Sequence, residues 1–83
     1  MWVYLLECSD KTLYCGWTVS LEKRIKSHNV GLASKYTRAR LPVELVYWEK
    51  LKDKRSAMKR EYALKQLSRN QKLELVRQFK FSR

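Results

Sequence analysis

The sequence predicts an α+β fold in which a small three-stranded antiparallel sheet is flanked by three helices, in the order β-β-α-β-α-α. Three runs rich in β-branched and aromatic residues predict the strands, at positions 2–6, 12–17 and 43–48. Three segments in which apolar residues recur at helical spacing predict the helices. The chain has 83 residues, of which 45% are hydrophobic, so it can build one core but not two. We therefore expect a single domain over residues 1–83.

The two N-terminal strands form a hairpin, and the length of its loop decides which side chains share a face. A two-residue loop would put Tyr4 and Tyr14 on opposite faces of the sheet. A three-residue loop at 9–11, usually a type I turn followed by a left-handed residue, pairs Tyr4 with Gly16 and puts both phenols on one face. We favour the three-residue loop, although Lys11 must then adopt a positive φ at a cost of roughly 1 kcal/mol.

The first helix follows the hairpin directly. Ser20 is a suitable N-cap, and we expect the helix to run for about nine residues and to end at 29–31. Leu21 and Ile25 form its apolar stripe. Arg24 and His28, at positions i and i+4, lie together beside that stripe. The first helix therefore places a guanidinium and the only histidine of the chain next to each other.

Two further helices follow the third strand. Asp53 or Ser56 caps the first of them, which we expect to reach Leu67. Its apolar side is broad and consists of Ala57, Met58, Tyr62 and Leu64. Ser68 and Gln71 form a capping box that opens the last helix. The inward side chains of that helix are Leu73, Val76 and Phe79.

The strongest signal in the composition is positive charge. The chain carries 19 Lys and Arg against 8 Asp and Glu, a formal net charge of +11. Such an excess opposes folding through self-repulsion, and a polyanionic partner relieves it. Nucleic acid is the first candidate and an anionic membrane surface the second. A basic protein without any such partner is the third interpretation.

Residues 31–42 form a basic loop that favours nucleic acid. Its candidate binding residues are Lys35, Tyr36, Arg38 and Arg40. Cations beside an aromatic ring suit a phosphate backbone and one stacked base. A solvated connector with no binding role is an equal alternative.

Several classes of protein are not expected. The chain has no apolar run of about 18 residues and no signal peptide, so we expect neither a membrane-spanning nor a secreted protein. Cys8 and Cys15 are too few for a disulfide framework, and the favoured hairpin points them to opposite faces. With His28 they would supply at most three zinc ligands, at a spacing that matches no common zinc module. We expect both to be small buried side chains in the reducing cytoplasm.

The predicted order of elements and a set of ordered polar residues resemble the GIY-YIG nuclease superfamily. In that family two short motifs lie on the first two strands, and residues 2–4 and 14–16 stand in their places here. The next helix carries an Arg and often a His four residues later, which Arg24 and His28 match. A Glu on a later helix holds the divalent metal, and Glu61 matches it.

The similarity covers nearly the whole chain and is closest to the small single-domain members. These share an Asn-x-Gly sequence, here 29–31, followed by Lys-Tyr-Thr at 35–37 and a Pro-Val-Glu-Leu-Val run at 42–46. Two positions depart from the motifs, since Trp2 replaces a Gly and Cys15 replaces an aliphatic residue. A late Asn of some members has only one candidate here: Asn70.

The resemblance implies a metal-dependent endonuclease that hydrolyses phosphodiester bonds, in DNA rather than RNA, with branched or nicked structures as expected substrates. It makes Tyr4 the general base, and because a phenol has a pKa near 10, nearby cations must lower that pKa. Tyr14 would position the water or the phosphate, and Arg24 would grip a phosphate oxygen. His28 would orient a phenol or relay its proton. Glu61 would hold one Mg²⁺.

Each of these roles has a simpler alternative. His28 also fits a satisfied histidine at a helix end, favoured there by the helix dipole. Glu61 also fits a plain ion pair with Arg60 or Lys65. For the whole chain, the main alternative is a nucleic-acid-binding module on the same fold with little or no turnover. A basic scaffold or partner-binding protein is the remaining one.

Overall fold

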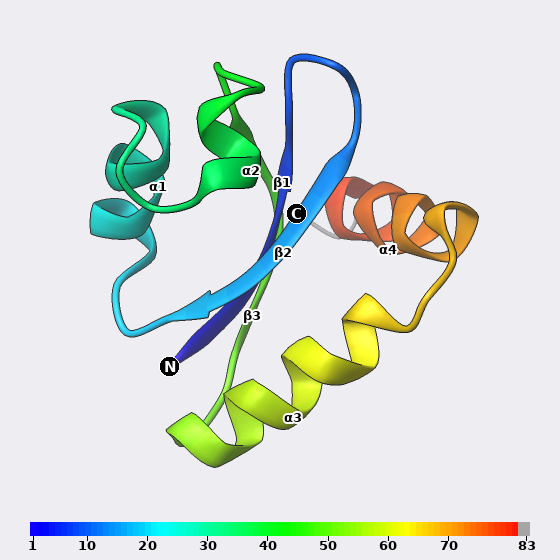
Figure 1. Ribbon diagram of the computed structural model, residues 1–83. Helices are drawn as coiled ribbons and strands as arrows, with labels where there is room; N and C mark the ends of the chain where they lie inside the picture. The colour runs from blue at the N-terminus through cyan, green and yellow to red at the C-terminus, as the bar shows by residue number, and fades with distance from the viewer. Residues whose placement is uncertain (82–83) are drawn as a thin grey trace.

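The computed structural model describes residues 1–81 and contains a three-stranded antiparallel sheet in the order β2-β1-β3 (Figure 1). The predicted α+β class and the predicted sheet are confirmed, with one additional short helix. The strands are β1 (Trp2–Glu7), β2 (Leu13–Thr18) and β3 (Glu44–Lys50). The helices are α1 (Leu21–Asn29), α2 (Lys35–Arg38), α3 (Lys54–Lys65) and α4 (Arg69–Phe81).

The hairpin between β1 and β2 has the predicted three-residue loop. Tyr4 pairs with Gly16 and Leu6 with Tyr14. Lys11 has a φ of 70°, and its N–H donates to the carbonyl of Cys8 at 2.9 Å. Because the register follows from this loop, the prediction that both phenols share a face is confirmed.

The strand β1 is central, and helices cover both of its faces. In Figure 1, α1 and α2 lie on one side of the sheet and α3 and α4 on the other. Val3 and Leu5 belong to the core under α3 and α4, whereas Tyr4 and Leu6 belong to a smaller core under α1. This alternation explains why β1 is apolar throughout: neither of its faces meets solvent.

The basic segment 31–42 is not only a loop, and that prediction is incomplete. It contains α2, whose N-cap Ser34 accepts hydrogen bonds from the N–H groups of Tyr36 and Thr37. The side chain of Thr37 is fully buried. A tertiary contact therefore fixes this turn, and local composition alone does not indicate it.

The helix α3 begins after the N-cap Asp53, which accepts a hydrogen bond from the N–H of Ser56 at 2.8 Å. The predicted broad apolar side is wrong, because Met58 is 48% and Tyr62 68% exposed. Only a narrow stripe with Ala57 and Leu64 faces the sheet. Successive helical residues are about 100° apart, so Met58 and Tyr62 turn away from that stripe.

The helix α4 opens with the predicted capping box, in which Ser68 and Gln71 exchange hydrogen bonds at 2.9 and 3.2 Å. Val76 is buried as predicted, but Leu73 is exposed. Leu75 packs against the core in its place. Phe79 also packs against the core as predicted, so the inward face of α4 differs from the expected one at Leu73 alone.

Both cysteines are free, buried thiols, as the sequence predicts. Burial raises the pKa of Cys15 to about 11, so this thiol stays protonated at neutral pH. No helix among residues 1–81 is both long enough and apolar enough to cross a bilayer.

Candidate active site

A pocket of about 340 Å³ opens over the edge strand β2 and is lined by residues from both helical layers. It is lined by Tyr4, Tyr14, Gly16, Trp17, Thr18, Val19, Arg24 and Glu61. The sheet supplies the phenols, α1 supplies Arg24 from one face and α3 supplies Glu61 from the other. Four site candidates from the sequence therefore meet in one cavity, namely Tyr4, Tyr14, Arg24 and Glu61, whereas His28 is not among its lining residues.

Gly16 allows the phenol of Tyr4 to reach this pocket. A Cβ atom at position 16 would lie 2.5 Å from Oη of Tyr4 and 2.7 Å from its Cζ. Any side chain there would displace the phenol, because real Cβ atoms do not approach other atoms so closely. The glycine of the second motif is thus explained by close packing in the sheet.

A buried chain of hydrogen bonds runs from Tyr4 through His28 to Thr37. Oη of Tyr4 lies 2.9 Å from Nε2 of His28, and Nδ1 of His28 lies 2.8 Å from Oγ1 of Thr37. The hydroxyl of Thr37 donates to the carbonyl of Ser34 at 3.4 Å, so it accepts from Nδ1–H. We therefore assign the proton of a neutral His28 to Nδ1, which leaves Nε2 to accept from the phenol.

Burial controls the protonation of this chain. It raises the pKa of Tyr4 well above its ordinary value, Tyr14 adds to the effect and Arg24 only partly opposes it. The expectation that nearby cations lower this pKa is therefore wrong for the protein alone, because desolvation outweighs the guanidinium. Burial also lowers the pKa of His28, and Arg24 lowers it further. At neutral pH the pair consists of a neutral phenol and a neutral imidazole.

His28 is 1% exposed, and both of its ring nitrogens are hydrogen bonded. It is therefore a satisfied histidine and a partner of the phenol at the same time. The two interpretations of this residue are not exclusive.

Arg24 is exposed at the pocket and, within residues 1–81, pairs with no carboxylate. A guanidinium without an internal partner is open to bind an anion such as a phosphate.

The carboxylate of Glu61 has one cationic neighbour, Lys65, with Nζ 3.7 Å away and a side chain that is 52% exposed. Arg60, the other expected partner, instead forms a salt bridge with Glu49 at 2.9 Å. An i,i+4 pair whose lysine is exposed to solvent holds its carboxylate only weakly. The backbone of α3 is also tied to β2, since the carbonyl of Glu61 accepts from Sγ of Cys15 at 3.9 Å.

The donor set limits what metal the pocket would take. Among residues 1–81, no group of three or more His, Cys, Asp or Glu side chains is clustered. Of the described residues that line the pocket, Glu61 is the one carboxylate. A single hard oxygen ligand fits Mg²⁺, which keeps several waters and commonly shares its coordination with a substrate phosphate.

The candidate nucleic-acid-binding residues of 35–40 fall into two groups. Lys35 and Arg38 are exposed on α2. Arg40 is engaged internally: its guanidinium lies 3.8 Å from the centroid of the Tyr36 ring and pairs with Asp10 at 3.0 Å. The Tyr36 ring also stacks on Tyr14, with centroids 5.9 Å apart. Residues 35–40 therefore pack against a side chain that lines the pocket, and they also carry exposed charge.

Two pieces of the arrangement were not predicted. Trp17 lines the pocket although its only sequence signal is its place beside Gly16. Thr37 fixes the tautomer of His28, and its position in the Lys-Tyr-Thr sequence was the available clue. Asn70, the candidate late Asn, is exposed in the first turn of α4 and is not among the lining residues.

This geometry agrees with a comparison to known families, in which residues 1–74 match the GIY-YIG catalytic domain. The chain belongs to the GIY-YIG family. UPF0213 protein CPE1444 of Clostridium perfringens is 59% identical over 75 residues, which are 90% of this chain and 81% of that protein. A UPF0213 protein of Syntrophus aciditrophicus is 51% identical over 78 residues, 93% of this chain and 90% of the other.

A solved structure supports the same fold. The solution NMR structure of the UPF0213 protein BH0048 from Bacillus halodurans is 45% identical, with a TM-score of 0.58. It covers 90% of this chain, which spans 80% of that one. GIY-YIG membership makes this a nuclease-like catalytic domain whose partner is nucleic acid.

Proposed function

We propose that this GIY-YIG protein is an endonuclease that hydrolyses phosphodiester bonds in DNA with the help of a divalent cation such as Mg²⁺. One observation carries the proposal: a phenol bonded to a neutral imidazole, an unpaired guanidinium and a carboxylate line the same pocket. Phosphodiester hydrolysis needs a base for water, a binding group for the phosphate and stabilisation of the leaving oxygen. The pocket has a candidate for each.

The base is the hydrogen-bonded pair of Tyr4 and His28. A water gives a proton to Oη of Tyr4 while the phenolic proton passes to Nε2 of His28, and the water oxygen bonds to phosphorus. The bond from phosphorus to the leaving oxygen breaks, and that oxygen takes a proton from solvent. His28, now an imidazolium, later returns its proton to solvent. This route needs no free phenolate, which the raised pKa of Tyr4 disfavours.

Arg24 and Tyr14 hold the phosphate in this scheme. The guanidinium of Arg24 binds a non-bridging oxygen, since no internal carboxylate competes for it among the described residues. The phenol of Tyr14 orients the phosphate or the attacking water. Its ring is fixed against His28 and Tyr36, at centroid distances of 5.2 and 5.9 Å.

Glu61 would hold the divalent cation, with Lys65 free to move aside because its side chain is half exposed. When bound, the ion would act as a Lewis acid and stabilise negative charge on the leaving oxygen.

The substitution Glu61→Gln tests the proposal. Glutamine is nearly isosteric with glutamate, so the variant should keep its fold and its affinity for DNA. It lacks the carboxylate charge, so cation-dependent cleavage should be abolished. The assay is a panel of labelled linear, nicked, flapped and branched DNA, with and without Mg²⁺. Cleavage by the variant at the parental rate would overturn the assignment of the metal ligand.

The second candidate is a nucleic-acid-binding module with little turnover. The raised pKa of Tyr4 favours it, because a phenol that holds its proton so firmly is a weak base by itself. This candidate predicts salt-dependent DNA binding by the parent protein but no cleavage of any substrate in the panel.

A further inference from the structure

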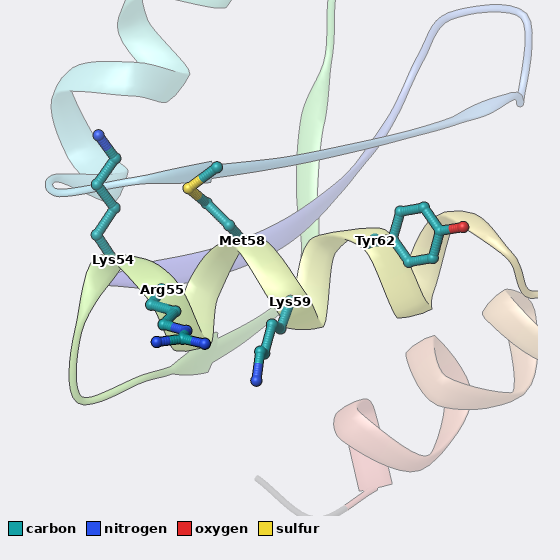
Figure 2. A pocket seen from close by; sticks show the side chains of 5 residues that line it. All are labelled: Lys54, Arg55, Met58, Lys59 and Tyr62. Atoms are coloured by element: carbon teal, nitrogen blue, oxygen red, sulfur yellow. The ribbon is translucent and has the colours of Figure 1, made fainter.

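The outer face of α3 presents an exposed apolar centre between cations. Lys54, Arg55, Met58, Lys59 and Tyr62 line a shallow surface pocket of about 650 Å³. Figure 2 shows these side chains following one another along the helix, from Lys54 at one end to Tyr62 at the other. Tyr62 is 68% and Met58 48% exposed, although both are large and apolar. We call these residues the α3 outer face.

The α3 outer face adjoins the candidate active site. Tyr62 directly follows Glu61, about 100° further around the helix. At the other end, Nζ of Lys54 lies 5.7 Å from the centroid of the Trp17 ring, and Trp17 lines the active-site pocket. If one phosphate of a polynucleotide lies beside Glu61, the neighbouring nucleotides on the α3 side of the pocket therefore contact the α3 outer face.

The charge of the face is complementary to nucleic acid. Lys54, Arg55 and Lys59 are exposed, and none of them forms a salt bridge within the part of the chain that the structure describes. Asp53 is an acidic neighbour of Lys59, but among the described residues no salt bridge joins the two side chains. The three cations are therefore available for phosphates.

The apolar centre distinguishes a single strand from a duplex. In a duplex the base faces are stacked inside, so Met58 and Tyr62 would meet only sugar and phosphate. A single strand offers unstacked bases, and an aromatic ring between cations is the usual platform for them. From Lys54 to Tyr62 the helix rises about 12 Å, in eight steps of about 1.5 Å, so the face is long enough to contact only a short single-stranded segment.

We propose that the α3 outer face binds a single-stranded segment of DNA that adjoins the scissile phosphate, so that the preferred substrates carry a flap or an unpaired tail. The assignment of substrate class rests on the proposed nuclease function. The binding itself does not depend on turnover and is tested separately.

The test compares a blunt duplex with the same duplex carrying a 5′ or a 3′ single-stranded tail, measured by fluorescence anisotropy. It uses the Glu61→Gln protein without added metal, so that no substrate is consumed. The Glu61→Gln protein should bind at least one tailed duplex more tightly than the blunt one. Adding Met58→Ala and Tyr62→Ala should weaken that tailed complex by about tenfold and the blunt complex by less than about twofold.

Two controls make the result specific. Tyr62→Phe keeps the ring and should keep the preference for a tail. Lys59→Ala should weaken tail binding more than Lys26→Ala, which removes the same charge from α1 on the opposite side of the sheet. Because these residues are exposed, the variants should remain folded, which circular dichroism checks.

Equal binding of tailed and blunt duplexes, or a double variant that keeps the preference, would overturn the proposal. If the double variant loses binding to vesicles of anionic phospholipid but binds DNA as before, the proposal is also overturned, and the face is a membrane contact. If the unsubstituted protein cleaves no substrate but the double variant loses tail binding, the inference stands and the proposed nuclease function fails. If the unsubstituted protein cleaves DNA but shows no preference for a tail, the nuclease function stands and the inference fails.

Discussion

The phenol of Tyr4 and the imidazole of His28 are joined by a buried hydrogen bond of 2.9 Å, although they lie on a strand and on a helix. The opposite side of the imidazole is bonded to Thr37 on α2. Side chains from β1, α1 and α2 thus form one fixed unit behind the pocket. In this unit Thr37 is a positioning residue, because it touches the ring and not the substrate.

Replacing Thr37 with Val should disturb catalysis through the tautomer of His28. Valine has a similar shape but cannot accept from Nδ1–H, so the ring loses its preference for that tautomer. We expect kcat to fall by about 10- to 100-fold with KM little changed. The free energy of unfolding should fall by about 1–3 kcal/mol, because a buried N–H is left without a partner.

A direct readout of the tautomer separates positioning from simple destabilisation. His28 is the only histidine in the chain, so its ¹⁵N resonances can be assigned without ambiguity. They should report Nδ1–H in the parent and a mixture in Thr37→Val. Thr37→Ser, which restores the hydroxyl, should recover the rate, and failure to do so would exclude the positioning role.

The pH dependence of activity should follow His28. Burial and Arg24 both lower its pKa, so the neutral base persists below its ordinary value of about 6.5. The acidic limb of kcat/KM is therefore expected below about pH 6.5. NMR titration checks the assignment, since Arg24→Gln should raise the pKa of His28 by removing the second of the two causes.

The lowered pKa of His28 also determines how the free energy of unfolding changes with pH. The folded state holds fewer protons at His28 than the unfolded state, so the free energy of unfolding should decrease as pH falls below about 6.5 toward the lowered folded pKa. Denaturant titrations at about pH 7.5 and 5.5 measure this difference, and in His28→Gln it should shrink. An equal pH effect in both proteins would show that other groups cause it.

Gly16→Ala should be disruptive out of proportion to one methyl group. The new Cβ would lie 2.5 Å from Oη of Tyr4, so the phenol must leave its place beside His28. We expect a loss of about 1–3 kcal/mol in the free energy of unfolding, together with loss of activity. In a Tyr4→Leu background the clash is absent, and Gly16→Ala should cost markedly less. Additive effects would contradict the packing explanation.

Lys35 and Arg38 should act through phosphates alone. For duplex DNA, log K falls against log salt with a slope of about −0.9 for each phosphate neutralised. Replacing each residue with Ala should flatten the slope by about one unit, for all DNA sequences alike. Arg40→Ala is the contrast: its charge is held by Asp10 and the Tyr36 ring, so it should change stability more than the slope. Unchanged slopes in Lys35→Ala and Arg38→Ala would remove α2 from the DNA interface.

Local chemistry determined most of what could be predicted. The turn at 9–11 fixes the hairpin register by itself, and the caps Ser20, Asp53 and Ser68 mark helix starts because each side chain bonds a nearby N–H. The convergence of the motif residues on one pocket followed from these elements, whereas their chemical roles stay predictions.

Features that depend on packing were not accessible from the sequence. The apolar residues of α3 do not show which part of its surface meets the sheet, so their pattern predicts Met58 and Tyr62 inside although both lie outside. The existence of α2 depends on burial of Thr37 against His28, a contact between separate helices. Likewise, the base role that the family resemblance implies for Tyr4 requires nearby cations to lower its pKa, but desolvation by burial is the larger effect and raises it.

The pocket spans the edge of the sheet, with Arg24 held by the layer on one face and Glu61 by the layer on the other. Neither layer contains a complete set of reactive groups. Loosening α1 or α3 separately, while the sheet stays intact, would therefore switch off the chemistry before the protein unfolds. Activity in this small domain therefore requires both helical layers to be packed on the sheet. We expect it to be lost in mild denaturant before the strands separate.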